Sequence, residues 1–141
     1  MNTEKDNKNQ SGQPQIPGGI ERILFVDDEE HLAELWKEIL ESLGYQVTAR
    51  SSSLEALEAF KKSPDRFDLM ITDMTMPQMT GAELSKEIKR IRPELPVILY
   101  TGFSMQISEK KAKRMGIRRF LTKPLALAVL AKTIREVLDE D

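Results

Sequence analysis

Apolar residues along this chain alternate between short continuous runs and helical spacing. A continuous run at residues 23–26 is followed by apolar positions three or four residues apart from Leu32 to Leu43, and Gly44 comes directly after them. A short apolar run predicts a buried strand, and spacing of three or four residues predicts a helix with one apolar face. A glycine directly after such a face is a typical helix stop. The pattern therefore predicts a strand and then a helix over residues 23–43.

The same alternation continues to the end of the chain. Four more apolar runs predict strands at residues 47–49, 69–71, 97–100 and 120–121. Helices are expected after the capping boxes Ser52-x-x-Glu55 and Thr80-x-x-Glu83, weakly over 106–115, and over 127–137. Five strands, each followed by a helix, predict an α/β fold with a parallel sheet covered on both faces.

The first 21 residues do not follow this pattern. They contain five glycines or prolines and only three sizeable apolar side chains. Such a segment buries too little apolar surface to offset the entropy lost on ordering. We therefore expect residues 1–21 to form a flexible lead or linker and residues 22–141 to form one domain.

Composition excludes several classes of site. The chain has no cysteine and one histidine, so it lacks the ligands for a zinc or iron–sulfur centre. Its longest apolar run, residues 125–131, is far shorter than the roughly 20 residues of a membrane span. A net charge of −2 favours no nucleic-acid partner. The polar N-terminus and the lack of cysteine favour the cytoplasm.

Polar side chains follow four of the five predicted strands. Asp27 and Asp28 follow the first strand, Asp73 the third, Thr101 the fourth and Lys123 the fifth. The carboxyl ends of parallel strands share one edge of the sheet, where ligands bind. Clustered carboxylates repel one another unless a cation lies between them, and oxygen ligands favour Mg²⁺. Carboxylate, cation, ammonium and hydroxyl together suit phosphoryl transfer, with a carboxylate as a candidate nucleophile.

Four motifs in this order resemble the receiver domain of two-component response regulators. They are Val-Asp-Asp-Glu at 26–29, Ile-Thr-Asp-Met-Thr-Met-Pro at 71–77, Tyr-Thr-Gly at 100–102 and Thr-Lys-Pro-Leu at 122–125. The resemblance covers about residues 22–138. It implies a flavodoxin-like (βα)5 fold with strand order 2-1-3-4-5. It also implies a phosphoryl group received from a histidine kinase or a histidine phosphotransfer protein.

The resemblance also implies roles for individual residues. Asp73 would be the phosphoacceptor, and Lys123 would pair with Asp73 or its phosphate. Asp28 would bind Mg²⁺ directly, Asp27 would bind it through water, and the main-chain carbonyl of Thr75 would be a further ligand. Asp73 would also belong to the metal site.

A second group of residues is implied to switch conformation on phosphorylation. Thr101 would move toward the phosphoryl group, and Phe120 would move inward into the space that Thr101 leaves. The resemblance further implies that Thr75 and Phe103 would lie at positions that tune how fast the phosphate is hydrolysed.

Charge along the chain is uneven. Residues 95–135 carry 9 basic and 1 acidic side chains, and residues 136–141 add four acidic ones. A surface with both signs can pair with its own copy across a two-fold axis. We therefore expect a weak, salt-sensitive homodimer on phosphorylation, formed through the fourth helix, the fifth strand and the fifth helix.

The expected function is a signalling receiver that catalyses its own phosphorylation and dephosphorylation, not an enzyme that turns over a separate substrate. One alternative is a phosphatase of the haloacid dehalogenase type, although that family has a second acid where this chain has Thr75. Another is an interaction module that only binds a cation. The receiver itself is either a stand-alone regulator or the terminal receiver of a hybrid histidine kinase.

Overall fold

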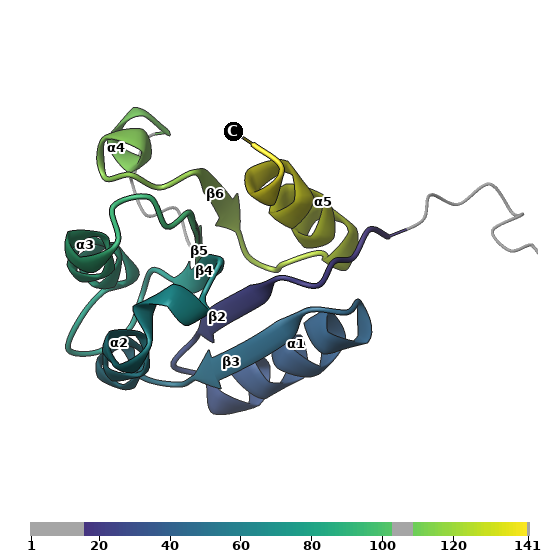
Figure 1. The fold of residues 1–141 in the computed structure, drawn as a ribbon, viewed down its shortest axis with the longest axis horizontal. Helices are drawn as coiled ribbons and strands as arrows, with labels where there is room; N and C mark the ends of the chain where they lie inside the picture. Colours follow the sequence, from purple (N-terminus) through teal and green to yellow (C-terminus); the bar gives the residue numbers. More distant parts are fainter. Residues whose placement is uncertain (1–15, 103–108, 141) are drawn as a thin grey trace, which may run out of the picture.

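The computed structural model describes residues 16–102 and 109–140, which form one parallel sheet with helices on both faces (Figure 1). The strands are β2 (Arg22–Val26), β3 (Gln46–Arg50), β4 (Leu69–Asp73), β5 (Val97–Thr101) and β6 (Arg119–Thr122). Their spatial order is β3-β2-β4-β5-β6, and every neighbouring pair is parallel. Counted along the chain, this order is 2-1-3-4-5, which confirms the predicted flavodoxin-like fold.

In the described residues, five α-helices cover the two faces of the sheet. They are α1 (Glu30–Ser42), α2 (Ser53–Lys62), α3 (Gly81–Ile91), α4 (Glu109–Arg114) and α5 (Leu127–Leu138), with a short 3-10 turn η2 (Pro64–Arg66) after α2. Helices α1 and α5 lie on one face, and α2, α3 and α4 lie on the other (Figure 1). None of the helices in the described ranges has the length and apolarity needed to cross a membrane.

Alternate residues of the central strands supply two separate cores. In β2, Leu24 and Val26 join the cluster under α2 and α3, whereas Ile23 and Phe25 join the cluster under α1 and α5. Every residue of β4 and β5 is buried. Burial on both faces explains why these strands are continuous apolar runs in the sequence. The carboxyl ends of β2, β4 and β5 are therefore held by closely packed side chains on both sides.

Local signals in the sequence place the helix ends. Thr80 and Glu83 make both hydrogen bonds of the capping box at the start of α3, and Ser52 accepts the Glu55 N–H at the start of α2. Gly44 and Gly116 follow α1 and α4 with φ of 107° and 82°. These left-handed conformations suit glycine, so the predicted stop at Gly44 is confirmed, and Gly116 ends α4 in the same way. In the expected helix 106–115, the described part is helical over Glu109–Arg114, and residues 106–108 lie outside the described residues.

Residues 16–21 contact the domain directly. The Gly19 N–H donates to the Leu43 carbonyl at 3.1 Å, and the Gly19 carbonyl touches Gly44. Glu21 accepts two hydrogen bonds from Arg135 of α5, at 2.8 and 2.9 Å. Residues 1–15 lie outside the described residues. The assignment of residues 1–21 to a flexible lead stays a prediction.

Candidate functional site

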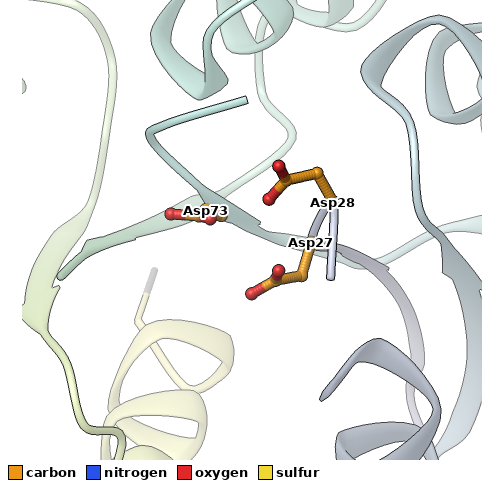
Figure 2. Close-up of side chains that lie close together, drawn as sticks. All are labelled: Asp27, Asp28 and Asp73. Carbon is orange, nitrogen blue, oxygen red and sulfur yellow. The ribbon is translucent and has the colours of Figure 1, made fainter. Parts of the chain in front are cut away.

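Three carboxylates meet at the carboxyl edge of the sheet. Asp27 and Asp28 directly follow β2, and Asp73 is the last residue of the neighbouring β4. One carboxylate oxygen from each residue lies within 4.8 Å of the others, and Figure 2 shows the three side chains directed to the same side of the strands. Asp27 and Asp73 are buried, whereas Asp28 is exposed. This donor set contains only oxygen and fits a hard divalent cation such as Mg²⁺.

Lys123 directly follows β6 and brings a positive charge to the same place. Its Nζ lies 3.4 Å from Asp73 Oδ2 and 3.6 Å from Asp27 Oδ2. Burial acts to lower the pKa of Lys123, but the charges of Asp27 and Asp73 outweigh burial and raise it above its ordinary value. The ammonium group therefore stays charged and bridges the two buried carboxylates.

Asp73 lies in surroundings that disfavour its negative charge. Burial raises the pKa of Asp73, and the charge of Asp27 raises it further. Lys123 and the Thr75 N–H, which donates to Asp73 Oδ1 at 3.3 Å, act in the opposite direction. The net pKa is above the ordinary value, so added positive charge beside Asp73 would favour its ionised, nucleophilic form.

These groups line one hollow of about 330 Å³. Its lining consists of Asp27, Asp28, Glu29, Asp73, Thr75, Gly102 and Lys123. A larger hollow of about 710 Å³ lies along the edge strand β3 and is lined by side chains of both signs. Within the described ranges, the three-carboxylate cluster lies only in the smaller hollow. The smaller hollow is therefore the better candidate for a functional site.

The predicted switch residues lie near the hollow but do not line it. Thr101 is 1% exposed at the end of β5, and its neighbour Gly102 lines the hollow. Phe120 lies in β6, beside Leu99 in register, and packs half-buried against the core under α2 and α3. Phe103 lies outside the described residues.

The start of α3 supports the backbone of Asp73. The Gly81 N–H donates to the Met74 carbonyl at 2.9 Å. A Cβ at position 81 would collide with the Asp73 carbonyl oxygen and lie 2.8 Å from Leu99 Cδ1. Glycine is thus required by a close backbone approach. The Thr80 capping box therefore begins a helix that packs directly on the candidate acceptor.

Tyr100 is a polar group in the site that the sequence analysis missed. Its hydroxyl donates to Asp27 Oδ2 at 2.5 Å, and Lys123 Nζ lies 5.3 Å from the centre of its ring. Burial, followed by the charge of Asp27, raises the pKa of Tyr100 well above its ordinary value. The available signal was a hydroxyl at the end of an otherwise apolar strand, next to Thr101.

Comparison with known proteins shows which family the chain resembles. The response regulator receiver domain family matches residues 23–135. The chain is 30% identical to Sensor kinase CckA of Brucella abortus over 86% of its own length and 13% of CckA. It is 28% identical to the polar-differentiation response regulator DivK of Brucella anthropi, over 84% of this chain and 96% of DivK.

The fold is also similar to that of a solved response regulator structure. The response regulator protein TrrA of Thermotoga maritima, in complex with Mg(2+)-BeF, has a TM-score of 0.74 and 30% identity, with 83% of this chain and 98% of TrrA covered. The family match spans all five strands and the carboxylate cluster. The chain therefore belongs to the response regulator receiver domain family, a signalling domain of two-component systems.

Proposed function

We propose that this domain accepts a phosphoryl group on Asp73 in a Mg²⁺-dependent reaction. The observation that carries the proposal is the meeting of Asp73 with two further carboxylates and Lys123 in one hollow. The backbone of Asp73 is paired with β5, and its carboxylate accepts from the Thr75 N–H and Lys123, so a carboxylate oxygen is positioned without loop closure. The donor would be a histidine kinase or a histidine phosphotransfer protein.

The reaction exchanges one bond for another. An Asp73 carboxylate oxygen attacks phosphorus, and the P–N bond to the donor histidine breaks as the O–P bond forms. The imidazole leaves with the bonding electron pair and takes up a proton. Lys123, 3.4 Å from Asp73, would neutralise charge on the phosphoryl oxygens.

A divalent cation would be held by Asp28 and Asp73 directly, by Asp27 through water, and by the main-chain carbonyl of Thr75. All four residues line the hollow. When bound, Mg²⁺ supplies positive charge that offsets the repulsion between carboxylates and phosphoryl oxygens. The TrrA structure with Mg(2+)-BeF supports this choice of metal, because TrrA shares the fold and 30% of aligned residues.

Phosphorylation would be read out through Thr101 and Phe120. Thr101 would move toward the phosphoryl group, and Phe120 would move inward. Thr101 pairs with Thr122 across β5 and β6, and Phe120 is two residues earlier in β6. A displacement of Thr101 would therefore reach Phe120 through adjacent strands.

Acetyl phosphate with Mg²⁺ tests the proposed acceptor. We expect the intact mass to increase by one phosphoryl group in the wild type and in an Asp65→Asn control, whose side chain is exposed outside the hollow. Asp73→Asn should abolish the increase. Turnover of free phosphate esters would instead support a haloacid dehalogenase type phosphatase, and no reaction would support a cation-binding interaction module.

We also propose the setting in which the domain works. A phosphoryl donor that uses ATP would place this domain in the cytoplasm. There it would act as a signalling domain that catalyses its own phosphorylation and dephosphorylation. The alignment with 13% of Sensor kinase CckA is consistent with a receiver that is one part of a longer kinase, whereas the alignment with 96% of DivK is consistent with a stand-alone regulator. The length of the native gene product discriminates between the two.

A further inference from the structure

The ring of Tyr100 is held tightly within the core. Tyr100 lies in β5 beside Asp73 of β4 in the strand register, and its side chain is fully buried. The ring packs against Phe25 of β2 with a centroid distance of 5.9 Å, in the core under α1 and α5. Close packing leaves the ring little freedom, so its hydroxyl is directed to a defined point.

That point is an oxygen of Asp27. The Tyr100 hydroxyl donates to Asp27 Oδ2 at 2.5 Å, and the Glu29 N–H donates to Asp27 Oδ1 at 2.8 Å. Asp27 is 0% exposed, so neither bond is exchanged easily for water. The two donors together determine the orientation of the Asp27 carboxylate.

The ammonium group of Lys123 approaches the same oxygen. Its Nζ lies 3.6 Å from Asp27 Oδ2, 3.4 Å from Asp73 Oδ2 and 5.3 Å from the centre of the Tyr100 ring. The hydroxyl thus makes the shorter contact with Asp27, and the ammonium remains closer to Asp73. Without the hydroxyl, the nearest donor to Asp27 Oδ2 would be Lys123, and a closer ion pair would draw Lys123 away from Asp73.

We propose that Tyr100 is a positioning residue of the phosphoacceptor pocket. Its hydroxyl orients Asp27 toward the metal position and keeps Lys123 available to Asp73, and the face of its ring attracts the ammonium, which lies 5.3 Å from the ring centre. This inference rests on the proposed function, because it gives the Mg²⁺ position and Lys123 the roles proposed above. Groups that orient a metal-binding carboxylate typically change metal affinity 10–100-fold when they are removed.

Titration calorimetry with Mg²⁺ compares the wild type with Tyr100→Phe and Tyr45→Phe. Tyr100→Phe keeps the ring and its packing on Phe25, so the fold should persist, which far-ultraviolet circular dichroism checks. We expect Mg²⁺ to bind about 10-fold more weakly to this variant. Tyr45→Phe is the matched control, because its hydroxyl accepts from Arg135 at 3.4 Å and does not line the candidate hollow. An unchanged Kd in Tyr100→Phe would overturn the inference.

Two nuclear magnetic resonance measurements separate positioning from a merely structural role. The chain has two tyrosines, so the Tyr45→Phe protein labelled with 13C at tyrosine Cζ has one signal, from Tyr100. That signal should shift on addition of Mg²⁺. In metal-free protein, Tyr100→Phe should shift the carboxyl signals of both Asp27 and Asp73, because Lys123 moves between them.

A shift of the Asp27 signal alone would overturn the role assigned to Lys123. A wild type that binds no Mg²⁺ would overturn the proposed metal site, and the metal-free spectra would still decide whether Tyr100 controls Lys123. Failure of this inference is therefore distinguishable from failure of the proposed function.

Discussion

Asp27 and Asp28 are sequence neighbours with different surroundings. Asp27 is fully buried and bonded to Tyr100, whereas Asp28 is exposed at the mouth of the hollow. A substitution at Asp27 disturbs a buried hydrogen-bond network, but one at Asp28 removes a proposed metal ligand with little effect on packing. Asp28 is therefore the cleaner position at which to test the metal.

At this residue we predict that Asp28→Asn weakens Mg²⁺ binding at least about 10-fold, because one of the proposed direct carboxylate ligands is lost. The melting temperature without metal should change little, since surface substitutions usually have small effects. Titration calorimetry and a thermal melt measure the two quantities. Glu30→Gln, an exposed acid in the first turn of α1, is the matched control. Equal loss of affinity in both variants would mean that only the general negative charge matters.

At the scale of elements, an ion pair joins residues that are 114 positions apart. Arg135 in the last turn of α5 donates to both carboxylate oxygens of Glu21, just before β2. The same guanidinium donates to Asp139 and to the Tyr45 hydroxyl. This network connects the start of the sheet, the end of α5 and the turn between α1 and β3.

The network predicts a pH-dependent contribution to stability. The hydrogen bonds from Arg135 lower the pKa of Glu21 below its ordinary 4.5. The ionised form therefore stabilises the fold above that value, and the contribution is lost as the pH falls through the lowered pKa. We expect Glu21→Gln to reduce the free energy of unfolding by about 1 kcal/mol at pH 7, since the pair is only partly exposed.

Chemical denaturation from pH 7 to pH 3 measures this effect. The difference between the wild type and Glu21→Gln should shrink toward zero at the acidic end. Glu58→Gln, on the exposed face of α2, should differ little from the wild type at any pH. A difference that stays constant with pH would show that Glu21 acts through packing and not through its charge.

At the scale of the whole molecule, the opposed charges at the start of β6 and at the end of α5 already meet within one chain. Arg118 donates to Glu140 at 2.7 Å, and Arg119 pairs with Glu140 and Glu136. These groups are partly exposed, so each pair contributes little to stability and is weakened by salt. Replacing these ion pairs within one chain by the same pairs between two copies would therefore cost little free energy.

The expected homodimer through α4, β6 and α5 remains a prediction. We expect the protein treated with Mg²⁺ and beryllofluoride to sediment as a dimer at low salt and as a monomer at high salt, because exposed ion pairs are screened. Glu140→Gln should weaken the dimer, whereas Glu58→Gln should not. A monomer at both salt concentrations would contradict the prediction.

Local patterns in the sequence predicted most of the fold. The continuous runs in β4 and β5 are buried along their whole length, and Gly44 ends a helix where the sequence predicted. The edge strand β6 has two apolar residues in its predicted range, and the structure extends it to Arg119–Thr122. Strand boundaries at an edge depend on pairing with β5, which a local pattern does not encode.

By itself, the sequence determined which carboxylates meet, because parallel strands direct their carboxyl ends to one edge and Asp27, Asp28 and Asp73 follow two of them. Only the tertiary structure decided how these acids are oriented. The Tyr100 hydroxyl reaches Asp27 across 73 positions, and Lys123 reaches Asp73 across 50. Such contacts depend on strand register and on which face each side chain occupies, and these are set only when the strands pair and the helices pack on them.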